Sequence, residues 1–300
     1  MKGSRTQKSV TNTVVSFASQ LIVILLGFLS RRVLIYSVGV EYLGINGLMS
    51  NILTIFSLAE SGIGLAIGYA LYKPLAENDI EQIKSLMRFF KYTYRALAIG
   101  TAAIGIAFYP LLPFFLKDNT APDANLVYWL FLLGSVSSYL WVYKTTLNTS
   151  DQNKYLYTIA STIAQIVVLV LKVLILYFAQ NYILYLAVDI GTTIVKNLIF
   201  CRIVDRRYPY LKDKNVRKLD PEVRKSLFTN IKALFLGKVG YIISQCSDNL
   251  VISSLVSVTA VGMYSNYTTL ITSVSGFVTT FSSGVTASMR NLIASETKER

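Results

Sequence analysis

Eight stretches of this 300-residue sequence are each long and apolar enough to cross a membrane as a helix. A membrane-spanning helix needs about 20 mostly apolar residues, and here 53% of the residues are hydrophobic whereas 15% are charged. The stretches cover residues 13–38, 43–71, 92–116, 126–148, 156–179, 182–204, 231–256 and 262–289. They lack the alternation of a strand, and in lipid only helices and closed barrels satisfy every backbone group. The sequence therefore predicts an all-α membrane protein, a polytopic helical bundle with about eight transmembrane helices.

Basic residues are concentrated in loops that share one side if the chain crosses eight times. They lie before the first stretch, at 73–95 after the second, around the turn after the fourth and at 202–225 after the sixth. The opposite loops carry one basic residue, Lys117. Because cytoplasmic loops are enriched in Lys and Arg, we expect a multi-pass protein with its N-terminus and residue 300 in the cytoplasm. The net charge of +13 then reflects topology and attraction to membrane lipids, and no nucleic-acid partner is expected.

The composition argues against most enzyme chemistry. The sequence contains no histidine, which excludes histidine-based acid–base catalysis and histidine-ligated metals. Cys201 and Cys246 are far apart and lack the spacing of a metal site. We find neither a glycine-rich phosphate-binding loop nor a G-x-S-x-G motif. We therefore expect no enzyme activity, no cofactor and no metal.

Capping residues mark two helix starts between the apolar stretches. Asp79 with Gln82 resembles a capping box, and the apolar face that follows, from Ile80 to Phe90, would lie at the membrane interface. Asp220 followed by Pro221 is typical of an N-cap with proline in the first turn. This second start predicts a helix that continues into the seventh apolar stretch.

A weak internal repeat suggests that the chain is built from two units. The segment VEYLGIN at 40–46 follows the first stretch and VTAVGMY at 258–264 follows the seventh, so a valine and a glycine recur at an offset of 218 residues. Parallel six-helix repeats are a known transporter architecture. We therefore predict an N-lobe of six helices over residues 1–205, a basic cytoplasmic linker over 206–230 and the first two helices of a C-lobe over 231–300. Since the second unit would end about 436 residues along, we expect the chain to be a fragment that lacks four or more helices.

Three segments carry a resemblance to a known family. They are GVEYLGINGL at 39–48, SLAESGIG at 57–64 and LYKPLA at 71–76. They resemble the N-terminal part of Wzx-type polysaccharide flippases, which belong to the exporter superfamily that also holds the lipid II flippase and the multidrug and toxin extruders. Members of this family have twelve to fourteen helices in two lobes.

The resemblance implies a function and a set of partners. It implies export of an undecaprenyl-pyrophosphate-linked oligosaccharide across a bacterial cytoplasmic (inner) membrane by alternating access, for cell-surface polysaccharide biosynthesis. The partners would be this lipid-linked oligosaccharide, membrane lipids, H+ or Na+ as a coupling ion, and polysaccharide polymerase or assembly proteins. Without a nucleotide site, an ion or the membrane potential would drive export, since moving one negative charge outward gains about 2.3 kcal/mol per 100 mV.

Charged residues inside the apolar stretches are the candidate site residues, because a charge in hydrocarbon is costly and usually functional. They are Arg31, Arg32, Glu60, Lys172, Asp189, Lys196 and Asp248. Four of the helices would place charges in one layer, about 9 to 12 Å from their predicted outer ends.

These residues fall into two groups by expected role. Arg31, Arg32, Lys172 and Lys196 are candidates for the pyrophosphate or the cavity, with an arginine as first choice because its planar fork suits phosphate oxygens. Glu60, Asp189 and Asp248 are candidates for coupling or gating. Adjacent helix residues point about 100° apart, so Arg31 and Arg32 cannot both face the centre of one cavity. Static salt bridges explain Lys172, Asp189 and Asp248 equally well, and close helix packing beside Gly62 and Gly64 explains Glu60.

Two other functions compete with glycan export. A cation-coupled drug or metabolite exporter of the same superfamily would prefer an acidic and aromatic cavity, whereas basic residues outnumber acidic ones in the first six stretches. A membrane enzyme of glycan assembly would need a large outer loop or a paired-acid motif, and the predicted outer loops are short. The sequence therefore favours an anionic substrate and a transporter.

Overall fold

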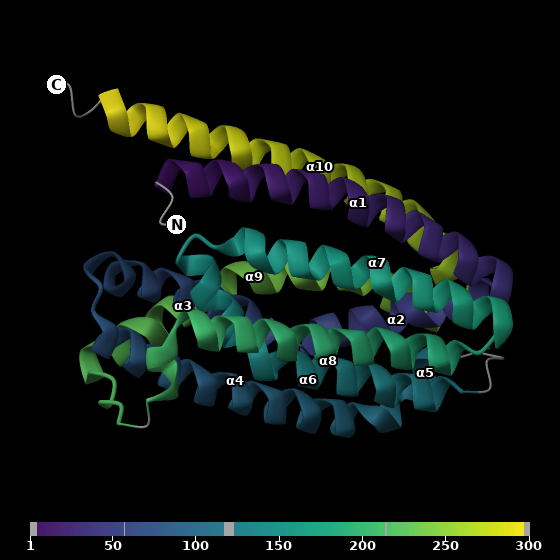
Figure 1. Ribbon diagram of the computed structural model, residues 1–300. Coiled ribbons are helices and arrows are strands. Elements are labelled where there is room, and N and C mark those ends of the chain that lie inside the picture. The colour runs from purple at the N-terminus through teal and green to yellow at the C-terminus, as the bar shows by residue number, and fades with distance from the viewer. Residues whose placement is uncertain (1–4, 57, 117–122, 214, 297–300) are drawn as a thin grey trace.

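The computed structural model describes residues 5–56, 58–116, 123–213 and 215–296, and this part of the chain is helical (Figure 1). The helices are α1 (Arg5–Val38), α2 (Val40–Phe56), α3 (Leu58–Glu77), α4 (Ile80–Phe108), η1 (Tyr109–Leu111), α5 (Leu112–Phe115), α6 (Ala124–Ser150), α7 (Lys154–Phe178), α8 (Tyr182–Arg207), η2 (Pro209–Lys212), α9 (Pro221–Leu255) and α10 (Val258–Glu296). The prediction of an all-α polytopic membrane protein is confirmed.

Five stretches of helix within the described residues are long and apolar enough to cross a membrane. They are Thr11–Val38, Ile80–Phe115, Ala124–Ser150, Lys154–Phe178 and Tyr182–Arg207. The predicted span over 43–71 coincides with α2 and α3, which the structure describes on either side of residue 57. The last two predicted spans lie within the long helices α9 and α10.

The helices run roughly along one axis, and the start of α1 and the end of α10 lie at the same end of the bundle (Figure 1). We call this the basic end, because the basic segments near 73–95 and 202–225 also lie there. Helices α1 and α10 run side by side along one edge, and α4 lies on the opposite edge (Figure 1). Between these edges, α1 packs on α7, α7 on α8, α8 on α6 and α6 on α4.

The first helical turns of α4 pack inside the protein. Ile83, Leu86 and Phe90 are at most 2% exposed and belong to a core cluster that also contains Ile67 of α3 and Phe200 of α8. The expectation that this apolar face lies at the membrane interface was therefore wrong. Hydrophobic periodicity identified the apolar face of α4, but it does not show what packs against that face. In the structure, other helices pack there instead of lipid.

Both predicted helix caps are confirmed. The Asp79 side chain accepts a hydrogen bond from the backbone N–H of Gln82 at 2.9 Å, and α4 begins at the next residue after Asp79. The Asp220 side chain accepts from the N–H of Glu222 at 3.0 Å, and α9 continues without a break from Pro221 into the seventh apolar stretch. Each cap satisfies a backbone donor that the first turn of a helix leaves free.

The two repeated segments lie against each other in space, at the end of the bundle opposite the basic end. A Cβ on Gly262 of α10 would lie 2.6 Å from the carbonyl oxygen of Val40, and a Cβ on Gly44 of α2 would fall on the carbonyl oxygen of Val258. Further along, a Cβ on Gly62 of α3 would lie 2.8 Å from the carbonyl oxygen of Ile231 on α9. Small residues at helix contacts let backbones approach closely in membranes, so α2 and α3 pack tightly on α9 and α10.

Candidate functional site

Three of the predicted site residues surround one cavity within the apolar part of the bundle. The cavity has a volume of about 260 Å³, lies between α1, α7 and α8, and is lined by Lys172, Asp189 and Lys196. We call it the lysine cavity. The remainder of its wall is a mixture of small polar and apolar side chains, including Ser30 of α1 and Gln165 of α7.

Lys172 is the best-defined charge in this cavity. Its Nζ donates to Asp189 Oδ2 at 2.7 Å, and the same Nζ lies 4.2 Å from the centroid of the Tyr185 ring. The Lys172 side chain is buried, whereas that of Asp189 is 47% exposed. A buried ammonium group held by both a carboxylate and an aromatic face is well compensated. The predicted static salt bridge between these two residues is therefore present.

Lys196 lies in the same cavity, two helical turns beyond Asp189 along α8. Its Nζ lies 5.3 Å from the centroid of the Tyr157 ring of α7. Within the part of the chain that the structure describes, Lys196 makes no ion pair. The cavity thus holds two ammonium groups and one carboxylate, and the excess charge is positive.

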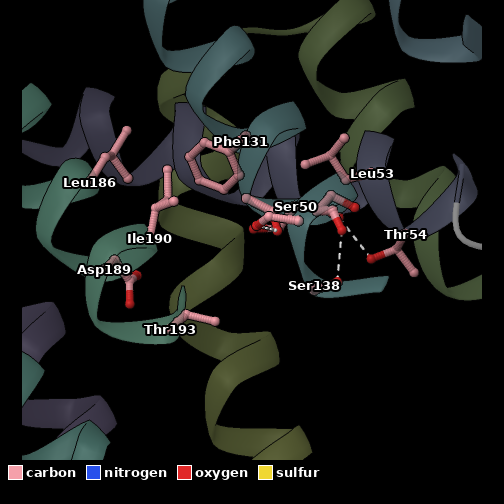
Figure 2. Close-up of a pocket in the computed structure, with 12 residues that line it drawn as sticks. Ser50, Leu53, Thr54, Phe131, Ser138, Leu186, Asp189, Ile190 and Thr193 are labelled. Atoms are coloured by element: carbon pink, nitrogen blue, oxygen red, sulfur yellow. Dashed lines mark hydrogen bonds between the residues drawn. The ribbon is translucent and has the colours of Figure 1, made fainter. Parts of the chain in front are cut away.

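A second cavity lies on the other side of α8 and shares Asp189 with the first. It has a volume of about 390 Å³ and is lined by side chains of α2, α6 and α8. Figure 2 shows Asp189 and Thr193 at one edge of this cavity and Ser138 and Thr54 at the other. Because Asp189 borders both cavities, a change in its hydrogen bonding would affect both of them.

The two adjacent arginines of α1 line one groove with Phe28, Ile35 and Tyr36, but they make different polar contacts. The guanidinium group of Arg31 donates hydrogen bonds to the side chains of Ser265, Asn266 and Thr269, all on α10. Arg32 is exposed, and its guanidinium carbon lies 5.7 Å from the centroid of the Tyr36 ring. Neither arginine lines the lysine cavity. The structure therefore places Arg31 at a contact between α1 and α10 and gives Arg32 no partner across the bundle among the described residues.

The two remaining acidic candidates lie apart from the lysine cavity. Glu60 is half-buried in the first turn of α3, close to the tight contact between Gly62 and α9. Asp248 of α9 is exposed and accepts a hydrogen bond from the Tyr264 hydroxyl of α10 at 2.7 Å. Glu60 therefore lies on a helix that packs on α9, and Asp248 lies on α9 itself, where it contacts α10.

The neutral polar residues that line the lysine cavity were not among the predicted site residues. On α7, Ser161, Gln165 and Lys172 share a face at spacings of four and seven residues, and on α8, Asp189, Thr192 and Lys196 do the same at spacings of three and four. These spacings are typical of one helix face. A search of the apolar stretches for polar residues at this period, in addition to charges, would have identified both stripes.

The arrangement suits a substrate with a multiply charged anionic group. Such a group would gain two charge-assisted hydrogen bonds from Lys172 and Lys196 and would compete with Asp189 for the first of them. Among the described residues, no three His, Cys, Asp or Glu side chains come together as a metal site would require.

Comparisons with known proteins show a family for this chain and a similar fold. The family described as "Polysaccharide biosynthesis protein" matches residues 9–287. A solved structure of a multidrug resistance MATE family transporter of the MOP superfamily, in an inward-facing conformation, has a similar fold, with a TM-score of 0.53 and 13% sequence identity. The similarity covers 84% of this chain and 59% of that transporter, so this chain spans somewhat more than half of its length. No protein with a curated description matches.

Proposed function

Because the chain belongs to the polysaccharide biosynthesis protein family, we propose that it exports an undecaprenyl-pyrophosphate-linked oligosaccharide across the bacterial cytoplasmic membrane. The family match confirms the resemblance to polysaccharide exporters, and the fold agrees with that of a transporter of the same superfamily. Both point to a transporter instead of a catalyst. The identity of the cargo is the new part of the proposal.

The observation that carries the proposal is the lysine cavity. A pyrophosphate carries about two negative charges, and Lys172 and Lys196 offer two positive charges in one membrane-embedded space. A buried charge is costly in lipid unless it is paired or functional, and Lys196 has no ion pair among the described residues. An anionic head group would satisfy it, whereas a drug cation would meet net repulsion.

In the proposed binding step, Lys172 changes partner. The pyrophosphate first meets Lys196 and then displaces the Asp189 carboxylate from the Lys172 ammonium group, with which Asp189 now forms a 2.7 Å contact. Asp189 is then left to take up a proton or a sodium ion, which makes it a candidate for coupling. An exchange of partners costs less than the opening of a buried ion pair with nothing to replace it.

The transport step would be alternating access between two lobes. We propose an N-lobe over residues 1–205, a linker over 206–230 and the start of a C-lobe over 231–300. The contacts of Gly44, Gly262 and Arg31 with the opposite lobe would close the end remote from the basic loops. Glu60 and Asp248 lie near this contact and are candidates for gating.

Orientation and energy source complete the proposal. The basic end would face the cytoplasm, so that anionic cargo moves outward down the electrical gradient. H+ or Na+ would reset the carrier, and polymerase or assembly proteins would receive the exported oligosaccharide. The membrane leaflet nearest the basic end would then be the one in which the cargo is made.

A complementation experiment tests this function. The complete natural protein is expressed in a bacterial strain that lacks its own lipid-linked oligosaccharide flippase, and surface polysaccharide is measured. We expect rescue by the wild type and a loss of about tenfold or more with Lys196→Ala, because a hydrogen bond to a charged group contributes about 1.5 to 3 kcal/mol. Lys154→Ala, which removes an exposed lysine at the start of α7, is the matched control and should rescue fully.

Two outcomes would contradict the proposal. Failure of the wild-type protein to rescue any of several flippase-deficient strains, together with efflux of cationic drugs, would indicate the cation exporter. Equal rescue by Lys196→Ala and Lys154→Ala at matched protein levels would show that the lysine cavity does not bind the cargo.

A further inference from the structure

A second basic cavity lies outside the proposed transport path, at the basic end of the bundle. It has a volume of about 520 Å³ and is formed by the start of α4, the end of α6, the end of α8, residues 210–213 and Val216. Five basic side chains line it, together with two acidic ones. The basic residues are Lys84, Arg88, Lys91, Lys144 and Lys212. We call this space the end pocket.

The acidic residues neutralise only part of this charge. Lys144 Nζ lies 2.8 Å from Asp205 Oδ2, and Lys84 Nζ lies 2.9 Å from Asp213 Oδ2. Within the described residues, Arg88, Lys91 and Lys212 make no ion pair with a carboxylate. The pocket therefore presents three cationic groups to whatever enters it.

The wall of the end pocket is held in place by hydrogen bonds to α4. Ser85 Oγ donates to the carbonyl oxygen of Arg217 at 2.9 Å, and Arg88 Nη1 donates to that of Val216 at 3.2 Å. Together with the contact between Lys84 and Asp213, these bonds tie the segment that follows α8 to α4. The cationic groups are thus gathered around a formed space instead of being spread along a free linker.

Tyr210, one of the tyrosines that line the pocket, is a neutral hydrogen-bond donor. Burial raises the pKa of the Tyr210 hydroxyl to about 12, and the charge of Asp151 adds to this effect. At neutral pH, Tyr210 therefore keeps its proton and can donate a hydrogen bond to an oxyanion. Phosphate oxygens accept from both ammonium and hydroxyl groups.

A surface that is apolar apart from the exposed Arg95 leads away from the pocket along α4. Tyr92, which lines the pocket, is 56% exposed, and Ile99, seven residues further on the same face, is 71% exposed. Both residues belong to a stretch that is apolar enough to span a membrane. A molecule with an anionic head and an apolar tail would therefore fit here, with its head in the pocket and its tail along this face of α4.

We propose that the end pocket binds the phosphate head group of an anionic phospholipid from the adjoining leaflet, with its acyl chains along the Tyr92 and Ile99 face of α4. Basic pockets at the cytoplasmic ends of transmembrane helices are a recurrent form of site for anionic lipid head groups. Because its wall includes the segment between α8 and α9, the bound lipid would stiffen the connection to α9. This site is separate from the lysine cavity, and its test does not depend on transport.

The test measures lipid binding to the purified protein in neutral detergent micelles. We expect phosphatidylglycerol to bind in a saturable manner and phosphatidylcholine not to do so. The triple variant Arg88→Ala/Lys91→Ala/Lys212→Ala should raise the dissociation constant for phosphatidylglycerol by about tenfold or more. The matched control Lys73→Ala/Lys154→Ala/Arg206→Ala removes three exposed basic residues at the same end but outside the pocket, and should change it by less than about twofold.

Other results would overturn the proposal. Equal weakening by the two triple variants would mean that phosphatidylglycerol is attracted by overall charge alone. Inorganic phosphate that binds as tightly as phosphatidylglycerol would mean that the site takes a free anion and gains nothing from the lipid. The single variant Lys91→Gln changes one exposed side chain, so any loss of affinity in it cannot be attributed to loss of folding. Unchanged affinity for phosphatidylglycerol in this variant and in the triple variant would also refute the site.

Discussion

Gly44→Ala is expected to destabilise the protein and to abolish export, although it adds one methyl group. The new Cβ would fall on the carbonyl oxygen of Val258, a backbone atom that cannot move unless α10 moves away from α2. Overpacking a close contact typically costs 1 to 3 kcal/mol, and here the contact also joins the two proposed lobes. The melting temperature in detergent and the export of polysaccharide report the two effects separately.

Gly100→Ala is the matched control for this substitution. Gly100 also lies within a long helix, α4, but a Cβ there would meet no atom within 4 Å. Alanine is a better helix former than glycine by about 1 kcal/mol, so this variant should melt at the same temperature as the wild type or slightly higher. If Gly44→Ala and Gly100→Ala show the same melting temperature and the same export, the close approach of α2 and α10 does not exist in the membrane.

Arg31→Ala is expected to reduce export by more than tenfold, whereas Arg32→Ala should leave it nearly unchanged. Arg31 donates to three side chains of α10, and each hydrogen bond from a charged group contributes about 1.5 to 3 kcal/mol. Its removal leaves Asn266 and the hydroxyls beside it without their donor. Arg32 is exposed, and its guanidinium carbon lies 5.7 Å from the centroid of the Tyr36 ring on its own helix.

Arg31→Lys makes this prediction more specific. Lysine keeps the charge but lacks the planar fork that reaches several acceptors at once, so we expect it to restore less than half of the lost export. Full export with lysine would mean that the charge at this position, and not the contact with α10, is what transport requires. Equal defects in Arg31→Ala and Arg32→Ala would show that the two side chains do not differ as the structure places them.

The helical segments could be predicted from the sequence because hydropathy and capping are local properties. Asp79 and Asp220 cap the helices that they were expected to cap, since an N-cap needs only its own side chain and the next few backbone groups. The burial of Leu86 and Phe90 was missed because periodicity does not say whether a face meets lipid or protein.

The candidate site was predicted in part for the same reasons. The cost of charge in lipid identified Lys172, Asp189 and Lys196, and the fold brings them to one cavity. The sequence pattern could not place Arg31 against α10, because that contact joins residues more than two hundred positions apart. The shared glycines at 44 and 262 were visible as a repeat, but their packing against each other's segment depends on the tertiary arrangement.

Reconstituted transport would show whether the lysine cavity binds an anionic lipid-linked glycan during its export. The complete natural protein is placed in liposomes that contain undecaprenyl-pyrophosphate-linked oligosaccharide, and movement of this lipid between leaflets is measured for the wild type, Lys172→Ala/Lys196→Ala and the exposed control pair Lys73→Ala/Lys154→Ala. The account predicts translocation by the wild type and the control pair, and at least a tenfold slower rate for the cavity pair. Translocation by the cavity pair at the wild-type rate, or none by the wild type under an imposed potential and ion gradients, would contradict it.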